Sequence, residues 1–280
     1  MPLKEKEELN GIVVTWDISG PEIPLSAVEA ALGKAKIVAD TKQRQTTAFT
    51  RAVKQINSGR ESVTLADKLK KRSVNPTYQL TEKSVDDTQA LYQEGAQIEL
   101  DLEEGKALTS NDALQEDINE KMQYAQCHRT AQDISNMVKR LFQNNADLYA
   151  INPRKGVAYF VPKEHMDFAE QVDTFLRELG GVLWSFPVPK GDESGDKSVK
   201  EAIDAGLNTL LQDLEKSVEE WGEDTGARAI KTANERWAMA AAKIEAYDYY
   251  LKDRHSVLVQ RLNDAKVDMQ TKITQLGKDK

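Results

Sequence analysis

The sequence is poor in the residues that most often carry chemistry. It holds one cysteine, Cys127, and three histidines, His128, His165 and His255, none of which has a second histidine at metal-ligand spacing. A single cysteine excludes an intramolecular disulfide and a multi-cysteine zinc site, and it fits a reducing compartment. We therefore expect no metal, no cofactor and no catalytic thiol.

Motifs of the common enzyme classes are also missing. The chain has no glycine-rich phosphate loop, no Gly-x-Ser-x-Gly elbow and no His-Glu-x-x-His helix. Carboxylates are abundant, but an enzyme that used them would need a pocket in which two carboxyl groups have different pKa values. The sequence therefore favours a protein that is not an enzyme.

Long apolar runs are absent as well. No stretch approaches the ~18 uninterrupted apolar residues of a membrane span, and the first eight residues lack the apolar segment of a signal peptide. The chain has 46 acidic and 38 basic residues, so its formal net charge is −8, which disfavours nonspecific binding to nucleic acid or to an anionic membrane. We expect a cytoplasmic protein.

The last third of the chain carries the clearest structural pattern. Hydrophobic residues make up 40% of the 280 positions, which suffices for a buried core. From 199 to 221, and again from 230 to 276, apolar residues recur every three or four positions, as on one face of a helix. Glycines at 222 and 226 separate the two runs. The pattern predicts an antiparallel helical hairpin.

A partial coiled-coil repeat runs through the second helix of this hairpin. Apolar residues recur every seven positions from Ile230 through Trp237 to Leu258, whereas the alternate seam fails at Arg254 and Arg261. Two arrangements fit this half repeat. The hairpin either packs on its own domain, or it projects as an arm that oligomerises.

The centre of the chain predicts a ferredoxin-like sheet. Strand patterns at 91–102, 147–151, 157–161 and 182–188 alternate with helical patterns from about 111 and at 164–179. Their order is β-α-β-β-α-β, the split βαβ arrangement.

The preceding region mixes a strand at 11–17, two helices, and strands at 62–70 and 77–82 that form a meander with the strand at 91–102. We therefore expect an α+β protein with a mixed region at 1–90, the ferredoxin-like domain at 91–190 and the helical hairpin at 191–280.

Large aromatic side chains on the hairpin are the candidate partner-binding residues, because such side chains often anchor interfaces. They are Trp221, Trp237, Tyr247, Tyr249 and Tyr250. The three tyrosines cannot all face one seam of a helix, so at least one should be exposed or engaged by a partner. The missing chemistry and the hairpin together predict an interaction or assembly protein that binds a protein partner or itself through its C-terminal helices.

Nucleic-acid binding is the alternative function. The stretch 155–161, Lys-Gly-Val-Ala-Tyr-Phe-Val, partly fits the RNA-recognition strand motif, with Tyr159 as the stacking candidate. A basic cluster could contact phosphates, and it consists of Lys68, Lys70, Lys71 and Arg72. A core strand and a solvated sheet edge explain the same two features without a ligand.

Two short motifs carry a resemblance to a known family. They are 47–52, Thr-Ala-Phe-Thr-Arg-Ala, and 155–162, Lys-Gly-Val-Ala-Tyr-Phe-Val-Pro. Together they resemble an uncharacterised family of prokaryotic and phage proteins, over most of 11–189, although Lys155 stands where that pattern prefers a second glycine. The family has no assigned activity, so the resemblance supplies no catalytic residue. It implies a phage or mobile-element protein that acts on the surface of a host protein.

Overall fold

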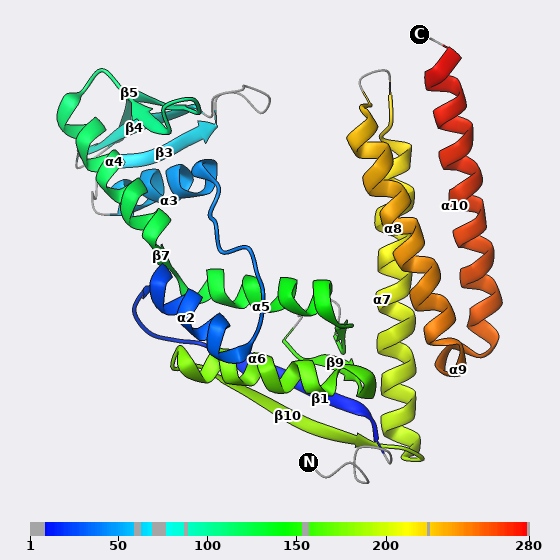
Figure 1. The fold of residues 1–280 in the computed structure, drawn as a ribbon. Helices are drawn as coiled ribbons and strands as arrows, with labels where there is room; N and C mark the ends of the chain where they lie inside the picture. The colour runs from blue at the N-terminus through cyan, green and yellow to red at the C-terminus, as the bar shows by residue number, and fades with distance from the viewer. Residues whose placement is uncertain are drawn as a thin grey trace. The chain divides into compact units, whose positions relative to one another are not determined.

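The structure is a computed structural model that describes residues 9–58, 63–68, 77–86, 89–152, 157–222 and 225–278. Helices and antiparallel sheets both occur, which confirms the expected α+β class (Figure 1). The chain forms two compact units, and each interleaves distant segments. Unit 1 is built from the described residues of Met1–Asp17, Val138–Asp173 and Val182–Lys280, and unit 2 from those of Ile18–Met137 and Thr174–Gly181. These units do not follow the three consecutive segments expected from the sequence.

The sheet of unit 1 has β1 (Leu9–Asp17) as an inner strand. Its strand order is β10-β1-β9-β8, where β10 is Val182–Pro189, β9 is Tyr159–Pro162 and β8 is Tyr149–Ala150. All neighbouring strands are antiparallel, and Val13 lies opposite both Phe186 and Phe160. The apolar run of β1 suits this inner place, since Leu9, Ile12 and Val14 are all buried there.

The ferredoxin-like assignment at 91–190 is wrong in its first strand. The strand expected at 91–102 is β5 (Gln89–Asp101), which pairs with β4 and β6 in unit 2 and not with β8, β9 or β10. Alternating apolar residues such as Ile98 and Leu100 predict a strand with one buried face, but they do not say which sheet the strand joins.

Two helices pack on one face of the unit 1 sheet. They are the parts of α5 (Ala131–Asn145) and α6 (Met166–Glu178) that belong to unit 1, namely α5 from Val138 on and α6 up to Asp173. The short 3-10 turn η1 (Lys163–His165) leads into α6. In unit 1 the Phe142 ring of α5 lies between Trp16 of β1, at 6.5 Å, and Phe168 of α6, at 5.6 Å, measured between ring centroids. These aromatic contacts join the sheet to both helices.

The C-terminal region forms three long helices and not the predicted two-helix hairpin. They are α7 (Glu193–Glu219), α8 (Ala227–Ala246) and α10 (Asp253–Lys278), with the single turn α9 (Asp248–Leu251) before α10. The second helix expected at 230–276 therefore breaks, and Lys252 adopts a positive φ of 45° at the break. Figure 1 shows α7, α8 and α10 side by side.

One end of the three-helix region packs on the unit 1 sheet. One continuous core contains Phe160 and Val188 from the sheet together with Ile203 of α7, Ile244 of α8 and Leu258 of α10. A smaller core lies farther along the same helices and consists of Leu214, Val218, Ala233, Ala265 and Met269. The helical region is thus docked on its own unit at one end and has a core of its own at the other.

Unit 2 is built on an antiparallel meander, as the strand pattern predicts. Its order is β3-β4-β5-β6, where β3 is Val63–Lys68, β4 is Thr77–Asp86 and β6 is Lys106–Leu108. The helices α3 (Gln45–Ser58) and α4 (Asp112–Cys127) share its core. Asn111 caps α4, because its side chain accepts a hydrogen bond from the Leu114 backbone N–H at 3.0 Å.

Unit 2 also contains the helix α2 (Leu25–Ala35), which follows β2 (Ile23–Pro24). β2 forms a two-stranded ladder with β7 (His128–Arg129).

Gly11 tests the close approach of β1 and β9. A Cβ at this position would overlap the carbonyl oxygen of Val161 and would lie 2.8 Å from the Phe160 ring. We expect Gly11→Ala to lower the free energy of unfolding by about 2 kcal/mol, because a backbone carbonyl cannot move aside cheaply. Gly222→Ala, where nothing lies within 4 Å of the new Cβ, should change it by less than about 0.5 kcal/mol. Equal effects in urea denaturation would contradict this packing.

Candidate functional site

A buried carboxylate lies where the sheet of unit 1 meets the C-terminal helices. Asp147, just before β8, is only 9% exposed. The Tyr247 hydroxyl at the end of α8 donates a hydrogen bond of 2.5 Å to it, and Lys243 of α8 forms an ion pair with its other oxygen. His165 Nε2 lies 3.5 Å from the same carboxylate. Side chains from α8 and from the turn η1 therefore converge on one negative charge that precedes β8.

The partners of Asp147 decide its ionisation. Burial alone would raise the pKa of this carboxyl group, but the bonds from Lys243 and Tyr247 outweigh burial and lower the pKa below its ordinary value of 3.8. Asp147 is therefore ionised at neutral pH and held by a cation and a hydroxyl.

Tyrosine rings surround this charge. The Tyr149 and Tyr247 rings meet edge to face at 5.4 Å between centroids, and burial raises the pKa of both hydroxyls. Burial also raises the pKa of Tyr250 to about 12, and its hydroxyl donates to Asn10 Oδ1 at 3.2 Å. The amide of Asn10 in turn donates to Asp196 at 2.5 Å. This polar network connects β1 and the segment before β8 to α7, α8 and α9. Its first role is therefore structural, and we call it the polar joint.

A cavity of about 580 Å³ opens beside this network, between α5, β8, α7 and α8. Lys139, Arg236 and Lys243 line it together with one carboxylate, Asp213. The rings of Tyr149 and Tyr159 and several apolar side chains supply much of the remaining lining. Both charged and apolar groups are thus available to a small molecule.

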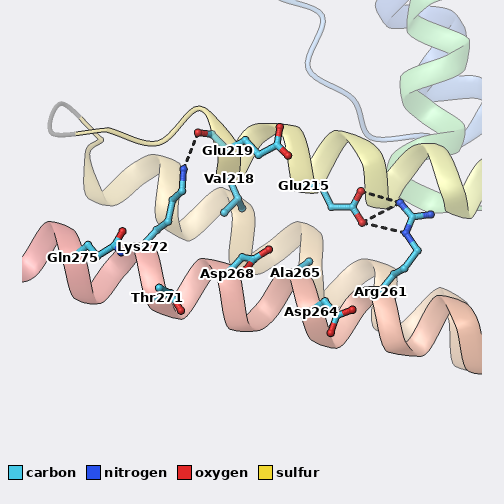
Figure 2. A pocket seen from close by; sticks show the side chains of 10 residues that line it. All are labelled: Glu215, Val218, Glu219, Arg261, Asp264, Ala265, Asp268, Thr271, Lys272 and Gln275. Carbon is cyan, nitrogen blue, oxygen red and sulfur yellow. Dashed lines mark hydrogen bonds and ion pairs between the residues drawn. The ribbon is translucent and has the colours of Figure 1, made fainter.

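A second groove, of about 400 Å³, runs between α7 and α10 (Figure 2). Arg261 binds Glu215 with two nitrogen-to-oxygen distances of 2.8 and 2.9 Å, and Lys272 donates to the Glu219 carbonyl at 2.7 Å. Both cations that line this groove are therefore engaged within the protein. Arg254 similarly pairs with Asp204 at 3.2 Å. The arginines that interrupt the predicted heptad seam are interhelical ion pairs, and the groove is a helix–helix interface.

Two arginines, Arg129 and Arg51, connect elements of unit 2. Arg129 is buried, which lowers the pKa of its guanidinium, and it donates to the carbonyls of Ala125, Gln126 and Thr41 at 2.7 to 3.1 Å. It thereby satisfies the carbonyls at the end of α4. Arg51 of α3 pairs with Glu22 and with Asp133, at the side of a groove of about 640 Å³. These contacts join α3 to α5 and tie the end of α4 to the segment before α3, which is a structural role.

The structure separates the five predicted partner-binding aromatics. Tyr247 is buried, Tyr250 is half-buried, and Trp221 packs on the smaller helical core. Trp237 is half-buried: its Nε1 donates to the Leu262 carbonyl at 2.9 Å, and the Lys266 ammonium lies 4.2 Å above its ring. Tyr249 alone among the five is well exposed, at 78%, which confirms that one of the three tyrosines faces solvent.

The residues of the nucleic-acid alternative are placed less completely. Lys68 ends β3, whereas Lys70, Lys71 and Arg72 lie outside the described residues. Tyr159 is only 8% exposed and stacks on Trp16 at 5.1 Å between centroids. A ring that is already stacked and buried would have to leave its core to stack on a base. This burial argues against the predicted role of Tyr159.

The sequence patterns do not predict one exposed aromatic pair. Trp184 and Phe186 of β10 are 46% and 56% exposed, and they lie on the same face of the strand because they are two residues apart. β10 lies at the edge of its sheet and contains no charged residue. Its prolines, Pro187 and Pro189, were the available signal, since proline within a sheet is confined mostly to edge strands.

The described ranges also bear on metal binding and on membrane crossing. Within them, no group of three or more His, Cys, Asp or Glu side chains is placed to hold a metal ion. No helix in the same part of the chain combines the length and apolarity that a membrane crossing requires.

The fold and its polar joint define an α+β protein in which a helical region docks on an antiparallel sheet. By sequence the chain belongs to DUF6744, a family of unknown function, and the match covers residues 10–278. It therefore includes the C-terminal helices, which lie beyond the stretch that the two short motifs suggested. No curated protein and no solved structure matches the chain.

Asp147→Asn tests the buried ion pair. A carboxyl group whose pKa is lowered by folding stabilises the folded state above its ordinary pKa, and this contribution is lost as pH falls through the lower folded value. We expect the variant to lose about 2 kcal/mol of unfolding free energy at pH 7. Its deficit should stay constant above about pH 5 and shrink below about pH 4.

Urea denaturation across this pH range measures the deficit, with Asp268→Asn, at an exposed carboxylate of α10, as the control. A deficit that is independent of pH down to the acid limit would contradict the ion-pair assignment.

Tyr247→Phe tests the buried hydroxyls at the alkaline end. Because folding raises the pKa of Tyr149, Tyr247 and Tyr250, their contribution to stability is complete below the ordinary value of 10.0 and is lost as pH rises above it. Above about pH 10 each such tyrosine makes the unfolding free energy fall by up to about 1.4 kcal/mol per pH unit. The variant should therefore lose stability less steeply than the native chain. Parallel slopes in alkaline denaturation would refute the burial of this hydroxyl.

Proposed function

We propose that this protein acts without catalysis, by protein–protein contact and self-association, and that the free edge of β10 is its contact surface. The observation that carries the proposal is the exposure of Trp184 and Phe186, at 46% and 56%, side by side on an edge strand. Isolated exposed apolar residues are ordinary, whereas adjacent large aromatics favour an interface.

The composition of β10 supports pairing between two copies. A strand without charged side chains brings no like charges together, even in a chain whose net charge is −8. Antiparallel pairing about Ser185 would place Trp184 of one copy opposite Phe186 of the other, an aromatic cross-strand pair that stabilises sheets. The prolines at 187 and 189 would keep the paired stretch short, so the contact closes as a dimer and does not extend.

The topology of unit 1 agrees with this use of β10. We infer that its sheet is ferredoxin-like, with β1 as the first strand and with the chain of unit 2 inserted between β1 and α5. The order β10-β1-β9-β8 and the antiparallel pairing of every neighbour support this inference, since they are what a β-α-β-β-α-β unit requires. In such a sheet β10 is the last strand and occupies a free edge.

The resemblance to prokaryotic and phage proteins extends this proposal. A protein that assembles through a strand edge needs no cofactor, and an assembled form could occupy the surface of a host protein. The phage or mobile-element setting, the host partner and a cytoplasmic location remain predictions from the sequence.

Replacing both aromatics tests the contact surface. We expect the native chain to associate and the variant Trp184→Ser with Phe186→Ser to weaken association roughly 30-fold or more, because aromatic anchors carry much of an interface's energy. Size-exclusion chromatography with light scattering over a concentration series measures the change. Val267→Ser removes an exposed apolar residue of α10 and serves as the control.

Two results would overturn the proposal. One is a native chain that stays monomeric at every concentration, and the other is a double variant that associates as the native chain does. Tyr249→Ser tests the alternative contact surface, the C-terminal helices predicted from the sequence. If the chain associates through those helices, Tyr249→Ser should weaken association and the β10 double variant should not.

A further inference from the structure

The cavity beside the Asp147 network has the make-up of a ligand site. Its volume, about 580 Å³, lies within the usual range for small-molecule pockets. The ring of Tyr149 and the side chains of Leu148, Leu210 and Met239 contribute apolar lining from β8, its preceding loop, α7 and α8. Thr209, Gln143 and Asn144 add hydroxyl and amide groups. A predominantly apolar lining with a few polar groups is typical of pockets that bind small molecules.

The local sequence of α7 creates this space. Gly206 lies so close to β8 that a Cβ there would be 2.6 Å from the Tyr149 ring. Its neighbour Ala205 is nearly as small and also lines the cavity. α7 can therefore approach β8 closely at Gly206. Because the side chains of α7 are small at this point, they leave the adjacent space unfilled.

Two of the three cations that line the cavity have no ion-pair partner among the described residues. Of the three lining cations, Lys243 is paired with Asp147. The Lys139 ammonium lies 5.9 Å from the centroid of the Tyr159 ring, and Arg236 has no ion-pair or hydrogen-bond partner among the described residues. The groove between α7 and α10 is different, because its Arg261 and Lys272 are both engaged. Two available cations therefore face a cavity in a chain of net charge −8.

We propose that this cavity binds a small molecule with an anionic group, a phosphate or a carboxylate, attached to an aromatic or apolar body. Lys139 of α5 and Arg236 of α8 pair with the anion from two different helices, because charge-assisted hydrogen bonds to such groups are strong. The apolar body lies against Tyr149, Leu210 and Met239. The proposal is independent of self-association through β10, since no residue is shared between the two surfaces.

Equilibrium dialysis of the full chain with two probes, 1-naphthyl phosphate and 1-naphthoate, tests the proposal and distinguishes the two anions. We expect at least one of them to bind with a dissociation constant of roughly 1 mM or tighter, the affinity accessible to ligands of this size. The neutral 1-naphthol should bind roughly tenfold more weakly, and added salt should weaken only the charged probes. Absence of binding by both anions, or equal binding of 1-naphthol, would overturn the proposal.

Paired variants locate the site. Lys139→Gln with Arg236→Gln removes both cations and should raise the dissociation constant of the better probe roughly tenfold or more. Arg140→Gln with Arg228→Gln removes one exposed cation from each of the same two helices without touching the cavity lining, and should change it by less than about twofold. Thermal unfolding by circular dichroism confirms that both pairs fold. Equal losses in the two pairs, or no loss in the first, would refute the assigned site.

Discussion

Unit 1 depends on the neutralisation of one buried charge. A carboxylate cannot be taken out of water cheaply, so Asp147 is tolerable only while Lys243 and Tyr247 are in contact with it. Those partners follow it by about a hundred positions in sequence and sit on α8, whereas Asp147 precedes β8. The docking of the helices on the sheet and the burial of this charge therefore depend on each other. Loss of Lys243 would remove the bound cation, and loss of the Tyr247 hydroxyl would remove a hydrogen bond from the buried carboxylate.

This docking governs which surfaces remain for function. A sheet of this kind can bind nucleic acid through aromatic residues on an open face. Here Phe160 is fully buried in the core that the sheet shares with α7, α8 and α10, and Tyr159 points into the aromatic stack with Trp16 on the side of α5. Phe186 lies on the same face as Phe160, because both are cross-strand partners of Val13, but the β10 end of this face stays exposed. The exposed aromatics of β10 and the cavity beside α7 therefore remain accessible to another molecule.

Local patterns were predicted well, and their partners were not. The stripe of α7 is buried at Val199, Ile203 and Leu207 as its period requires, and the meander of unit 2 follows from its turns and alternation. The sequence could not predict that β1 is an inner strand of the unit 1 sheet, because its neighbours β9 and β10 are about 150 and 175 residues away in sequence. Arg254 and Arg261 of α10 interrupt the heptad pattern, and the pattern alone could not show that each lies beside a carboxylate of α7.

The candidate sites show the same difference between local patterns, which the sequence predicts, and contacts between distant segments, which it does not. By itself the sequence determined the α+β class, the amphipathic helices and the lack of recognisable catalytic motifs, since these depend on residue type and on spacing along the chain. Only the tertiary structure decided that Tyr247 is buried, that Trp184 and Phe186 are exposed, and that Lys139 and Arg236 line one cavity. Exposure and proximity depend on which distant segments pack together, and that choice is made by the whole core and by the burial of Asp147, not by any local pattern.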